Sequence, residues 1–284
     1  MDTSGQGSSR GTDGLRFDRI AHLISPEVLR DKIVLQVGVG SGGAAVNDHL
    51  TMNGVRRWIL FDPDTYDDVN LVKHPRLRSQ LGIPKVSSQR EWIVDRNPAA
   101  DVREFAEDVM SSAGFADSVQ AADLVLCCAD RNDVRSFVNA SCVEHHRPCV
   151  TASVFRQGYG GEVYAYLPGV SGCYECMVRV ADEQGWNVDD AIEPTKEEEE
   201  TIYGLGLREY KASGLSMDIQ AVATIQARIA LDLLMPERSR KLSPLPANWV
   251  VVYNRPIPSI QGSGFLRATL LRVKPRKDCR CSEG

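Results

Sequence analysis

Short apolar runs alternate with amphipathic segments along the first half of the chain. Runs rich in branched and aromatic residues predict strands over 33–37, 58–61, 102–105, 124–128 and 149–154. Apolar positions at helical spacing predict helices over 44–52, 84–95 and 132–146. The same spacing occurs over 15–29, with a helix start expected at Ser25-Pro26, since Ser favours the cap and Pro the first helical position. Alternating strands and helices predict a parallel sheet built from right-handed βαβ units.

The second half of the chain has a different pattern. Runs over 161–167, 249–253 and 265–273 predict strands with short connections, and residues 215–235 predict one long helix. We expect these strands to extend the same sheet in the antiparallel sense. The sequence therefore predicts an α/β fold whose doubly wound sheet is parallel in its first half and has an antiparallel extension.

Composition narrows the class of protein. Hydrophobic residues make up 43% of the chain and charged residues 25%, which is typical of a globular protein. The net charge of -5 argues against a broad nucleic-acid surface. The longest apolar stretch, residues 219–235, contains polar residues and predicts a buried helix, so no membrane association is expected. The first residues have no apolar core that would predict a secretory signal, and the expected location is the cytoplasm.

A glycine-rich segment directly follows the strand over 33–37 and directly precedes a helix. It fits the pattern G-x-G-x-x-G, and its glycines are Gly38, Gly40, Gly42 and Gly43. Glycines let the backbone approach phosphate, and a helix N-terminus favours negative charge. Asp62 ends the next strand, about 20 residues later, where a ribose-binding carboxylate is expected. This order predicts a Rossmann-like nucleotide site, with a structural glycine turn as the alternative.

The residues after Asp62 indicate which nucleotide would bind. Asp64, Asn70, Lys73 and Lys85 place an amide and cations near the phosphate loop, which suits a polyphosphate. The histidines form no evident constellation for hydride transfer, so a dehydrogenase is the weaker interpretation.

Eight cysteines include two close pairs, Cys173/Cys176 and Cys279/Cys281. In a reducing compartment, such pairs more often hold a metal than form disulfides. We expect a tetrahedral site for Zn²⁺ that pins the C-terminal region, with four reduced thiols as the alternative. The remaining cysteines lie in apolar runs and are expected to pack in the core; they are Cys127, Cys128, Cys142 and Cys149.

These motifs together resemble the ubiquitin-activating superfamily. The likeness is greatest to the compact bacterial adenylyltransferases that activate sulfur carriers for molybdopterin and thiamine synthesis, and it covers nearly the whole chain. Its motifs are Arg16-Phe17-Asp18-Arg19, the loop from Gly38 to Gly43, Asp62-Pro63-Asp64 with Asn70-Leu71, Gly82 to Lys85, Ala129-Asp130-Arg131-Asn132 with Arg135 and Asn139, and the first cysteine pair.

The resemblance implies adenylation. The C-terminal glycine of a small ubiquitin-like β-grasp protein would attack the α-phosphate of ATP and displace pyrophosphate. Asp62 would hold the ribose, Asn70, Lys73 and Lys85 would contact phosphates, and Asp130 would hold Mg²⁺. Arg19 would reach the phosphates of a partner subunit, which implies a homodimer.

The composition of the first residues and the resemblance together predict a division of the chain. A flexible tail over residues 1–14 would precede a single adenylation domain over 15–284. Residues 15–155 would form its nucleotide-binding half, and 156–284 the antiparallel extension with a crossover loop over 177–213 and the zinc-binding tail. The acidic part of this loop, residues 182–212, is either a solvated surface loop or a mobile segment that binds a partner.

The sequence departs from the family pattern in three places. Lys73-His74 stands where the family has Arg-Gln, and Lys lacks the bidentate fork of Arg. The second cysteine pair is C-x-C, where the family has C-x-x-C.

The third departure is that residues 177–213 contain no cysteine, where many relatives carry a thioester nucleophile. Either the chain only adenylates and passes its product to a separate sulfur-donor or conjugating protein, or it uses another cysteine such as Cys127 or Cys128. Alternative functions are an inactive scaffold subunit of a heterodimer and a tRNA threonylcarbamoyl-adenosine dehydratase.

Overall fold

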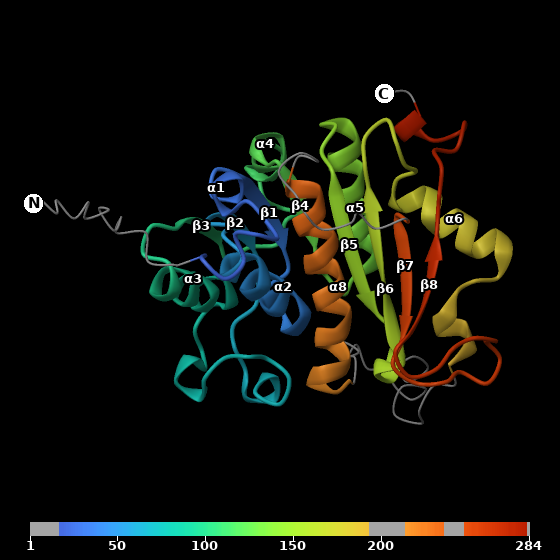
Figure 1. Ribbon diagram of the computed structural model, residues 1–284, viewed down its shortest axis with the longest axis horizontal. Helices are drawn as coiled ribbons and strands as arrows, with labels where there is room; N and C mark the ends of the chain where they lie inside the picture. The colour runs from blue at the N-terminus through green and yellow to red at the C-terminus, as the bar shows by residue number, and fades with distance from the viewer. Residues whose placement is uncertain (1–16, 193–213, 236–246, 283–284) are drawn as a thin grey trace, which may run out of the picture.

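Eight strands form one mixed sheet in the order β3-β2-β1-β4-β5-β6-β7-β8. The computed structural model describes residues 17–192, 214–235 and 247–282 (Figure 1). The parallel strands are β1 (Ile33–Val37), β2 (Arg57–Phe61), β3 (Asp101–Phe105), β4 (Leu124–Cys127) and β5 (Cys149–Val154). The antiparallel strands are β6 (Gly160–Tyr166), β7 (Trp249–Tyr253) and β8 (Arg267–Leu271). The predicted fold class is confirmed.

The order of the strands creates a switch point between β1 and β4. The chain runs outward from β1 to β2 and β3, and then crosses back to β4 on the other side of β1. Val37, the last residue of β1, pairs with Phe61 on β2 and with Cys127 on β4. The carboxyl ends of these strands therefore lie at one edge of the sheet, where ligands of such folds bind.

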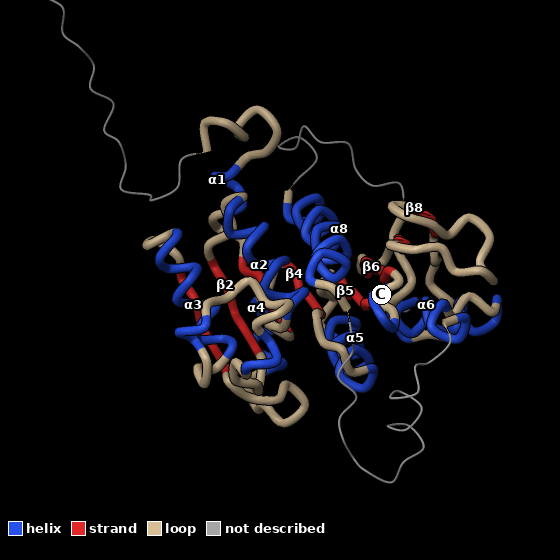
Figure 2. Tube along the Cα trace, turned by 90° about the horizontal axis from the view of Figure 1, so that it is seen from below, coloured by secondary structure: helices blue, strands red, loops and turns tan. Residues whose placement is uncertain are grey.

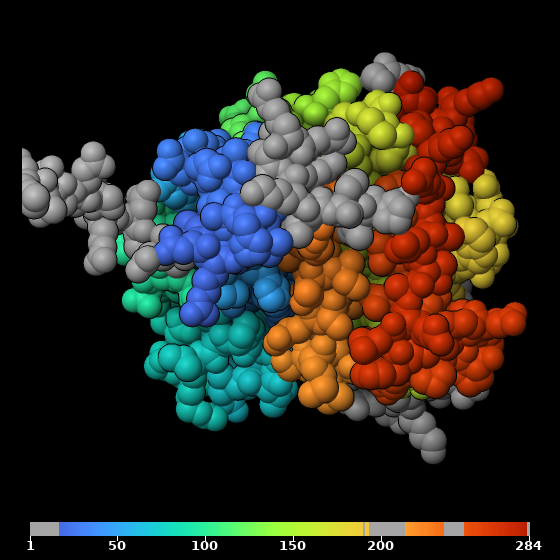
Figure 3. Space-filling model, viewed as in Figure 1, coloured from blue at the N-terminus to red at the C-terminus, as the bar shows by residue number. Residues whose placement is uncertain are grey.

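Helices cover both faces of the sheet (Figure 2). One face carries α1 (Pro26–Leu29), α2 (Ser41–Met52), α3 (Lys85–Arg96) and α8 (Ser216–Leu234). The other face carries α4 (Phe115–Ala121), α5 (Asn132–Glu144) and α6 (Tyr174–Gln184). In Figure 3, α8, in orange, reaches the surface between the parallel half and the red C-terminal strands. Short 3-10 helices complete the described elements: η1 (Asp68–Asn70), η2 (Arg78–Gln80), η3 (Arg156–Gly158), η4 (Val188–Ala191) and η6 (Arg280–Ser282).

Two hydrophobic cores hold these layers together. Trp58 and Leu60 of β2 face the core that α2 and α8 cover, whereas Ile59 and Phe61 face the core that α4 and α5 cover. Both sets are nearly fully buried, which explains why the central strands read as continuous apolar runs.

The structure differs from the predicted elements in four places. Over 15–29, the described residues form turns followed only by α1, because Pro26 lacks the N–H that a continuous helix would need. Helix α4 was not predicted. Helix α6 occupies the first part of the predicted crossover loop over 177–213, and β8 is shorter than predicted. The predicted tail over 1–14, Arg16 and the acidic residues 193–213 lie outside the described residues. None of the described helices, over residues 17–192, 214–235 and 247–282, combines the length and apolar character that crossing a bilayer requires.

Candidate functional site

The glycine loop joins β1 to α2 with very little space around its backbone. The Gly38 amide donates to the Phe61 carbonyl at 2.8 Å, and its φ of +89° lies in the region that favours glycine. A Cβ on Gly38 would lie 2.9 Å from the carbonyl atoms of Cys128, and one on Gly43 would lie 2.2 Å from the Gly38 oxygen. The loop therefore requires glycine at both ends, and it delivers the N-terminus of α2 to the switch point.

Asp62 follows β2, and its carboxylate binds the backbone of the glycine loop. Its Oδ2 accepts the Val39 amide at 2.6 Å, and its Oδ1 accepts the Asp64 amide at 2.9 Å. Burial raises the pKa of Asp62, while Lys85 and the two amides oppose that shift. The carboxylate is only 5% exposed, so it organises the loop backbone in addition to the ribose contact that the sequence predicts.

Lys85 begins α3 and lies against Asp64. Its Nζ is 2.6 Å from Asp64 Oδ2, and its amide donates to the Asp64 carbonyl at 2.9 Å. The Lys85 side chain is 9% exposed, whereas that of Asp64 is 63% exposed. The Lys85 ammonium is thus buried, and the Asp64 carboxylate beside it is exposed to solvent.

The segment from Asn70 to Lys73 lies against the start of α2. Ser41 Oγ donates to the Lys73 carbonyl at 2.6 Å. Asn70 Oδ1 accepts the Asp67 amide at 3.0 Å, and the Asn70 carbonyl accepts the Lys73 amide at 3.0 Å. The structure therefore brings the Lys73 backbone to the start of α2, and the predicted contact of its side chain with phosphate stays a prediction.

His74 is a buried residue of the same segment. It is 8% exposed, and its Nδ1 is 3.2 Å from Tyr66 Oη. Burial, followed by Lys85, Lys73 and Arg76, lowers the pKa of His74 to about 3. The ring is therefore neutral at physiological pH.

Asp130 lies at the same edge of the sheet, in the loop after β4, and is exposed. Arg135 on α5 holds this loop, because its Nε donates to the Ala129 carbonyl at 2.9 Å and a terminal nitrogen donates to Asn132 Oδ1 at 2.7 Å. An exposed carboxylate on a fixed loop could take part in binding a magnesium ion.

Arg19 is placed elsewhere. It is exposed in the turn before α1, and its neighbours Phe17 and Asp18 line a hollow with Gly54 and Asn97. Gly54 and Asn97 precede β2 and β3, so this hollow lies at the amino ends of the strands. The structure does not bring Arg19 to the lysines of its own chain, and the prediction of a contact with a partner subunit stays a prediction.

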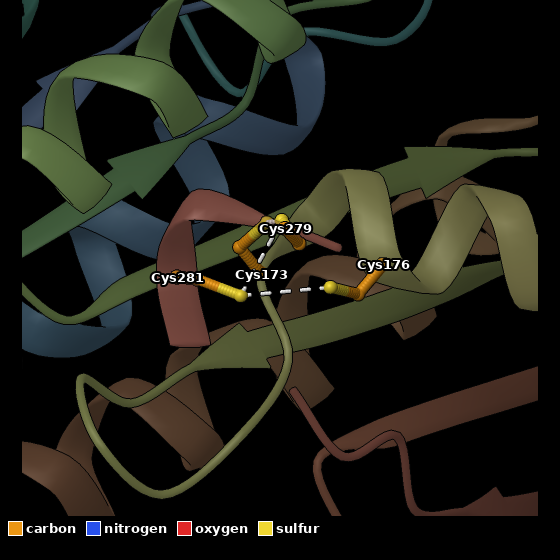
Figure 4. Close-up of side chains that lie close together, drawn as sticks. All are labelled: Cys173, Cys176, Cys279 and Cys281. Atoms are coloured by element: carbon orange, nitrogen blue, oxygen red, sulfur yellow. Dashed lines mark hydrogen bonds between the residues drawn. The ribbon is translucent and has the colours of Figure 1, made fainter. Parts of the chain in front are cut away.

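The two predicted cysteine pairs meet in space (Figure 4). The four buried Sγ atoms lie within 4.8 Å of one another, and the pairs Cys173/Cys279, Cys176/Cys281 and Cys279/Cys281 are each 3.5 Å apart. A tetrahedral zinc ion with Zn–S bonds of ~2.3 Å places its sulfurs about 3.8 Å apart. The cluster therefore has the donor set and nearly the spacing for a metal ion such as zinc. The C-x-C pair reaches it because Cys281 lies in the turn η6.

A short chain of contacts joins this cluster to the Asp130 loop. The Tyr174 amide, next to Cys173, donates to Asn139 Oδ1 at 2.8 Å. Asn139 lies one turn along α5 from Arg135, which holds the Ala129 carbonyl. Arg135 and Asn139 therefore lie on the same face of α5, and this face contacts both the Asp130 loop and the segment that carries Cys173.

The other cysteines are core residues, as predicted, except that Cys128 is only partly buried. Burial raises the pKa of Cys127 to about 12 and that of Cys128 further still. Thiols held in the protonated form are weak nucleophiles. Cys127 and Cys128 are therefore poorly suited to carry a thioester.

Several residues at the site were not predicted from the sequence. Arg76, Asp48 and Gln89 are hydrogen-bonded to one another, and Asn47 joins them to Gln36. For Asn47 and Gln89, the sequence signal is a polar residue at a position where the helical spacing of α2 and α3 predicts burial. Gln36 is a polar residue inside the apolar run of β1, and Arg76 has no such signal.

Two curated proteins are similar to this chain in sequence. Molybdopterin-synthase adenylyltransferase from Escherichia coli (strain K12) is 32% identical over 158 residues, which cover 55% of this chain and 63% of the relative. Ubiquitin-like modifier-activating enzyme 5 from Drosophila erecta is 31% identical over 164 residues, covering 53% of this chain and 40% of the relative. The chain thus matches only part of these relatives' length.

Similarity of structure extends further than similarity of sequence. A crystal structure of E. coli MccB with ATP matches 89% of this chain and 67% of the MccB chain, with a TM-score of 0.67 and 19% identity. This likeness shows a shared fold. The model of the ThiF family matches residues 17–256. The chain therefore belongs to the ThiF family.

Proposed function

We propose that this protein is an ATP-dependent adenylyltransferase that activates the C-terminal glycine of a ubiquitin-like or sulfur-carrier protein. The observation that carries the proposal is the glycine loop at the β1/β4 switch point, together with the contacts that tie the lysine segments to it. Ser41 binds the Lys73 backbone, and Asp62 binds both the loop and the backbone of Asp64, the partner of Lys85. The printed names of the two curated relatives describe an adenylyltransferase and a modifier-activating enzyme, and MccB, which shares the fold, has been solved with ATP. These names support the same chemistry.

Each residue has a role that follows from its position. The α2 N-terminus and the glycine loop would hold phosphates, and Asp62 would hold the ribose. The carrier carboxylate would attack the α-phosphate, and pyrophosphate would leave as Lys73 and Lys85 neutralise its growing charge. Asn70 would contact phosphate, and Asp64 keeps the Lys85 ammonium oriented before ATP arrives. Asp130 would hold Mg²⁺, which shields phosphate charge when bound. Arg19 would act on a partner subunit in a homodimer.

The proposed enzyme forms the acyl-adenylate and no thioester of its own. Residues 177–213 contain no cysteine, and burial protonates Cys127 and Cys128. A separate sulfur-donor or conjugating protein would then take the activated carrier.

ATP–pyrophosphate exchange tests this proposal directly. The full chain is incubated with MgATP, labelled pyrophosphate and candidate β-grasp proteins that end in Gly-Gly. Exchange that depends on both the carrier and its terminal glycine supports the proposal, and a carrier that lacks the last glycine serves as the control. Absence of MgATP binding by calorimetry would refute it. A carrier adduct that survives denaturation but is cleaved by dithiothreitol would show that a cysteine of this chain does form a thioester.

We propose zinc for the cysteine cluster, and its removal should destabilise the protein. Cys176→Ser is expected to reduce the metal content from about one zinc ion per chain. The variant should lose about 4 kcal/mol of unfolding free energy if free zinc exceeds its Kd a thousandfold. Atomic emission and thermal unfolding measure both effects. The control is Cys149→Ala, which changes a buried cysteine outside the cluster and should keep its zinc. An equal zinc content in Cys176→Ser and the wild type would contradict the assignment.

A further inference from the structure

A continuous hydrogen-bonded group of polar side chains lies inside the parallel half, and we call it the loop network: Gln36, Asn47, Asp48, Arg76 and Gln89. Gln36 on β1 is fully buried, and its Nε2 donates to the carbonyls of Gly38 at 2.9 Å and Gly43 at 2.8 Å. Its Oε1 accepts from Asn47 Nδ2 at 3.2 Å. The loop network is therefore hydrogen-bonded, through Gln36, to the carbonyl groups at both ends of the glycine loop.

Gln89 on α3 continues the network from α2. Its Nε2 donates to Asn47 Oδ1 at 2.7 Å and to Asp48 Oδ1 at 3.0 Å, and its Oε1 accepts from Arg76. Both Asn47 and Gln89 are fully buried. A single amide thus joins helix α2 to helix α3 and to the segment that carries Lys73.

Arg76 closes the network. Its two terminal nitrogens donate to the two carboxylate oxygens of Asp48, at 2.7 and 3.1 Å, in a bidentate pair. Its guanidinium carbon lies 5.1 Å from the centre of the Trp92 ring, and the side chain is 2% exposed. Among the described residues, Nε of Arg76 has no hydrogen-bond partner, but its other donors fix the guanidinium in one orientation.

Polar side chains in these positions weaken the core unless their bonds are made, because burial removes their bonds to water. Apolar residues of similar size would pack there without that requirement. Apart from Arg76 Nε, the buried polar atoms of the loop network are bonded, and such a network permits one arrangement of the elements that it joins. The loop network therefore fixes the relative positions of the elements that it joins more than it stabilises the fold.

The network joins the three segments that the proposed function brings to triphosphate. These are the glycine loop through Gln36, the Lys73 segment through Arg76, three residues further on, and the start of α3 through Gln89, one turn after Lys85. We infer that Gln89 and Arg76 are positioning residues that set the distance of Lys73 and Lys85 from the glycine loop. This inference rests on the proposed function, since it concerns how the same site holds the β- and γ-phosphates of ATP.

Binding of MgATP and of AMP separates this role from a general structural one. In Gln89→Leu, the Kd for MgATP should rise about tenfold, since one charge-assisted phosphate contact is misplaced. The Kd for AMP should stay as in the wild type, because AMP lacks the phosphates that the lysines would contact. Calorimetry measures both constants at a temperature where circular dichroism shows the variant folded. Arg76→Lys, which keeps the charge but loses the fork, is a milder second variant and should show the same selective loss.

A double-mutant cycle completes the test. In a Lys85→Ala background, Gln89→Leu should weaken MgATP binding much less than it does alone, because the residue acts through the lysine. The matched control is Asn97→Ala, which removes a buried amide that accepts the Ala99 amide at the opposite edge of the sheet. Its affinities for MgATP and AMP should equal those of the wild type.

Three results would overturn the inference: equal weakening of MgATP and AMP binding by Gln89→Leu, unchanged MgATP binding, or fully additive effects with Lys85→Ala. A wild-type protein that does not bind MgATP would instead overturn the proposed function itself. The two failures are therefore distinguishable.

Discussion

Lys85→Ala is expected to lower kcat/KM for ATP–pyrophosphate exchange about hundredfold, the usual loss when one donor to a developing charge is removed. The Lys85 side chain is buried beside Asp64, so water cannot easily replace its charge. The fold should remain, since Asp64, its partner, is exposed and stays solvated after the change. Asp130→Ala should abolish exchange for a related reason, because the proposed Mg²⁺ site would lose its carboxylate. Exchange kinetics with a confirmed carrier measure both effects.

Lys32→Ala is the matched control for Lys85→Ala. Lys32 also forms an ion pair with an aspartate, at 3.0 Å from Asp123, but it precedes β1 and lies at the opposite edge of the sheet. Exchange by this variant should equal that of the wild type. Full activity of both Lys85→Ala and Asp130→Ala would remove these residues from the mechanism.

Gly43→Ala should abolish measurable MgATP binding and also destabilise the protein. The added Cβ would lie 2.2 Å from the Gly38 oxygen and 2.9 Å from Gln36 Nε2, so the loop must open. Forcing extra volume into a well-packed site costs about 1–3 kcal/mol. Because the clash is with the backbone of the loop itself, relief of the strain would displace the groups that face the phosphates. Calorimetry and thermal unfolding report the two losses separately.

Gly114→Ala is the control for Gly43→Ala. A Cβ on Gly114 meets nothing within 4 Å, and its φ of -93° is accessible to alanine. Its unfolding free energy should change by less than about 0.5 kcal/mol, with MgATP binding intact. Normal nucleotide binding by Gly43→Ala would show that the loop geometry at Gly43 is unrelated to ligand binding.

Much of the sheet could be predicted because its signal is local. The strands β1 and β7 begin and end where their apolar runs do, since residues buried on both faces leave a continuous run. Helix α8 was predicted within one residue at each end for a similar reason. Helix α6 was missed in the sequence because charged residues such as Glu175 and Asp182 obscure the stripe formed by Tyr174, Met177 and Ala181.

The candidate site was predictable only in part. The glycine loop and Asp62 follow from their order along the chain, because adjacent elements of a βαβ unit are also adjacent in space. The contact of Gln36 with Gln89 through Asn47 depends on the packing of α3 against α2, which no local pattern encodes. The burial of His74 and the placement of Arg19 at the other edge of the sheet likewise depend on long-range packing.

A metal ion held by the four cysteines would close a long loop of chain, since Cys173 and Cys279 are 106 residues apart in sequence and their Sγ atoms are 3.5 Å apart. The entropy of closing a ring grows only with the logarithm of its length. Ten residues inserted into the exposed connection over 261–266 would therefore cost only ~0.1 kcal/mol in closure entropy. Denaturant midpoints of such insertions should stay close to that of the parent chain. This part of the molecule can thus change its length while the edge that carries the glycine loop keeps its shape.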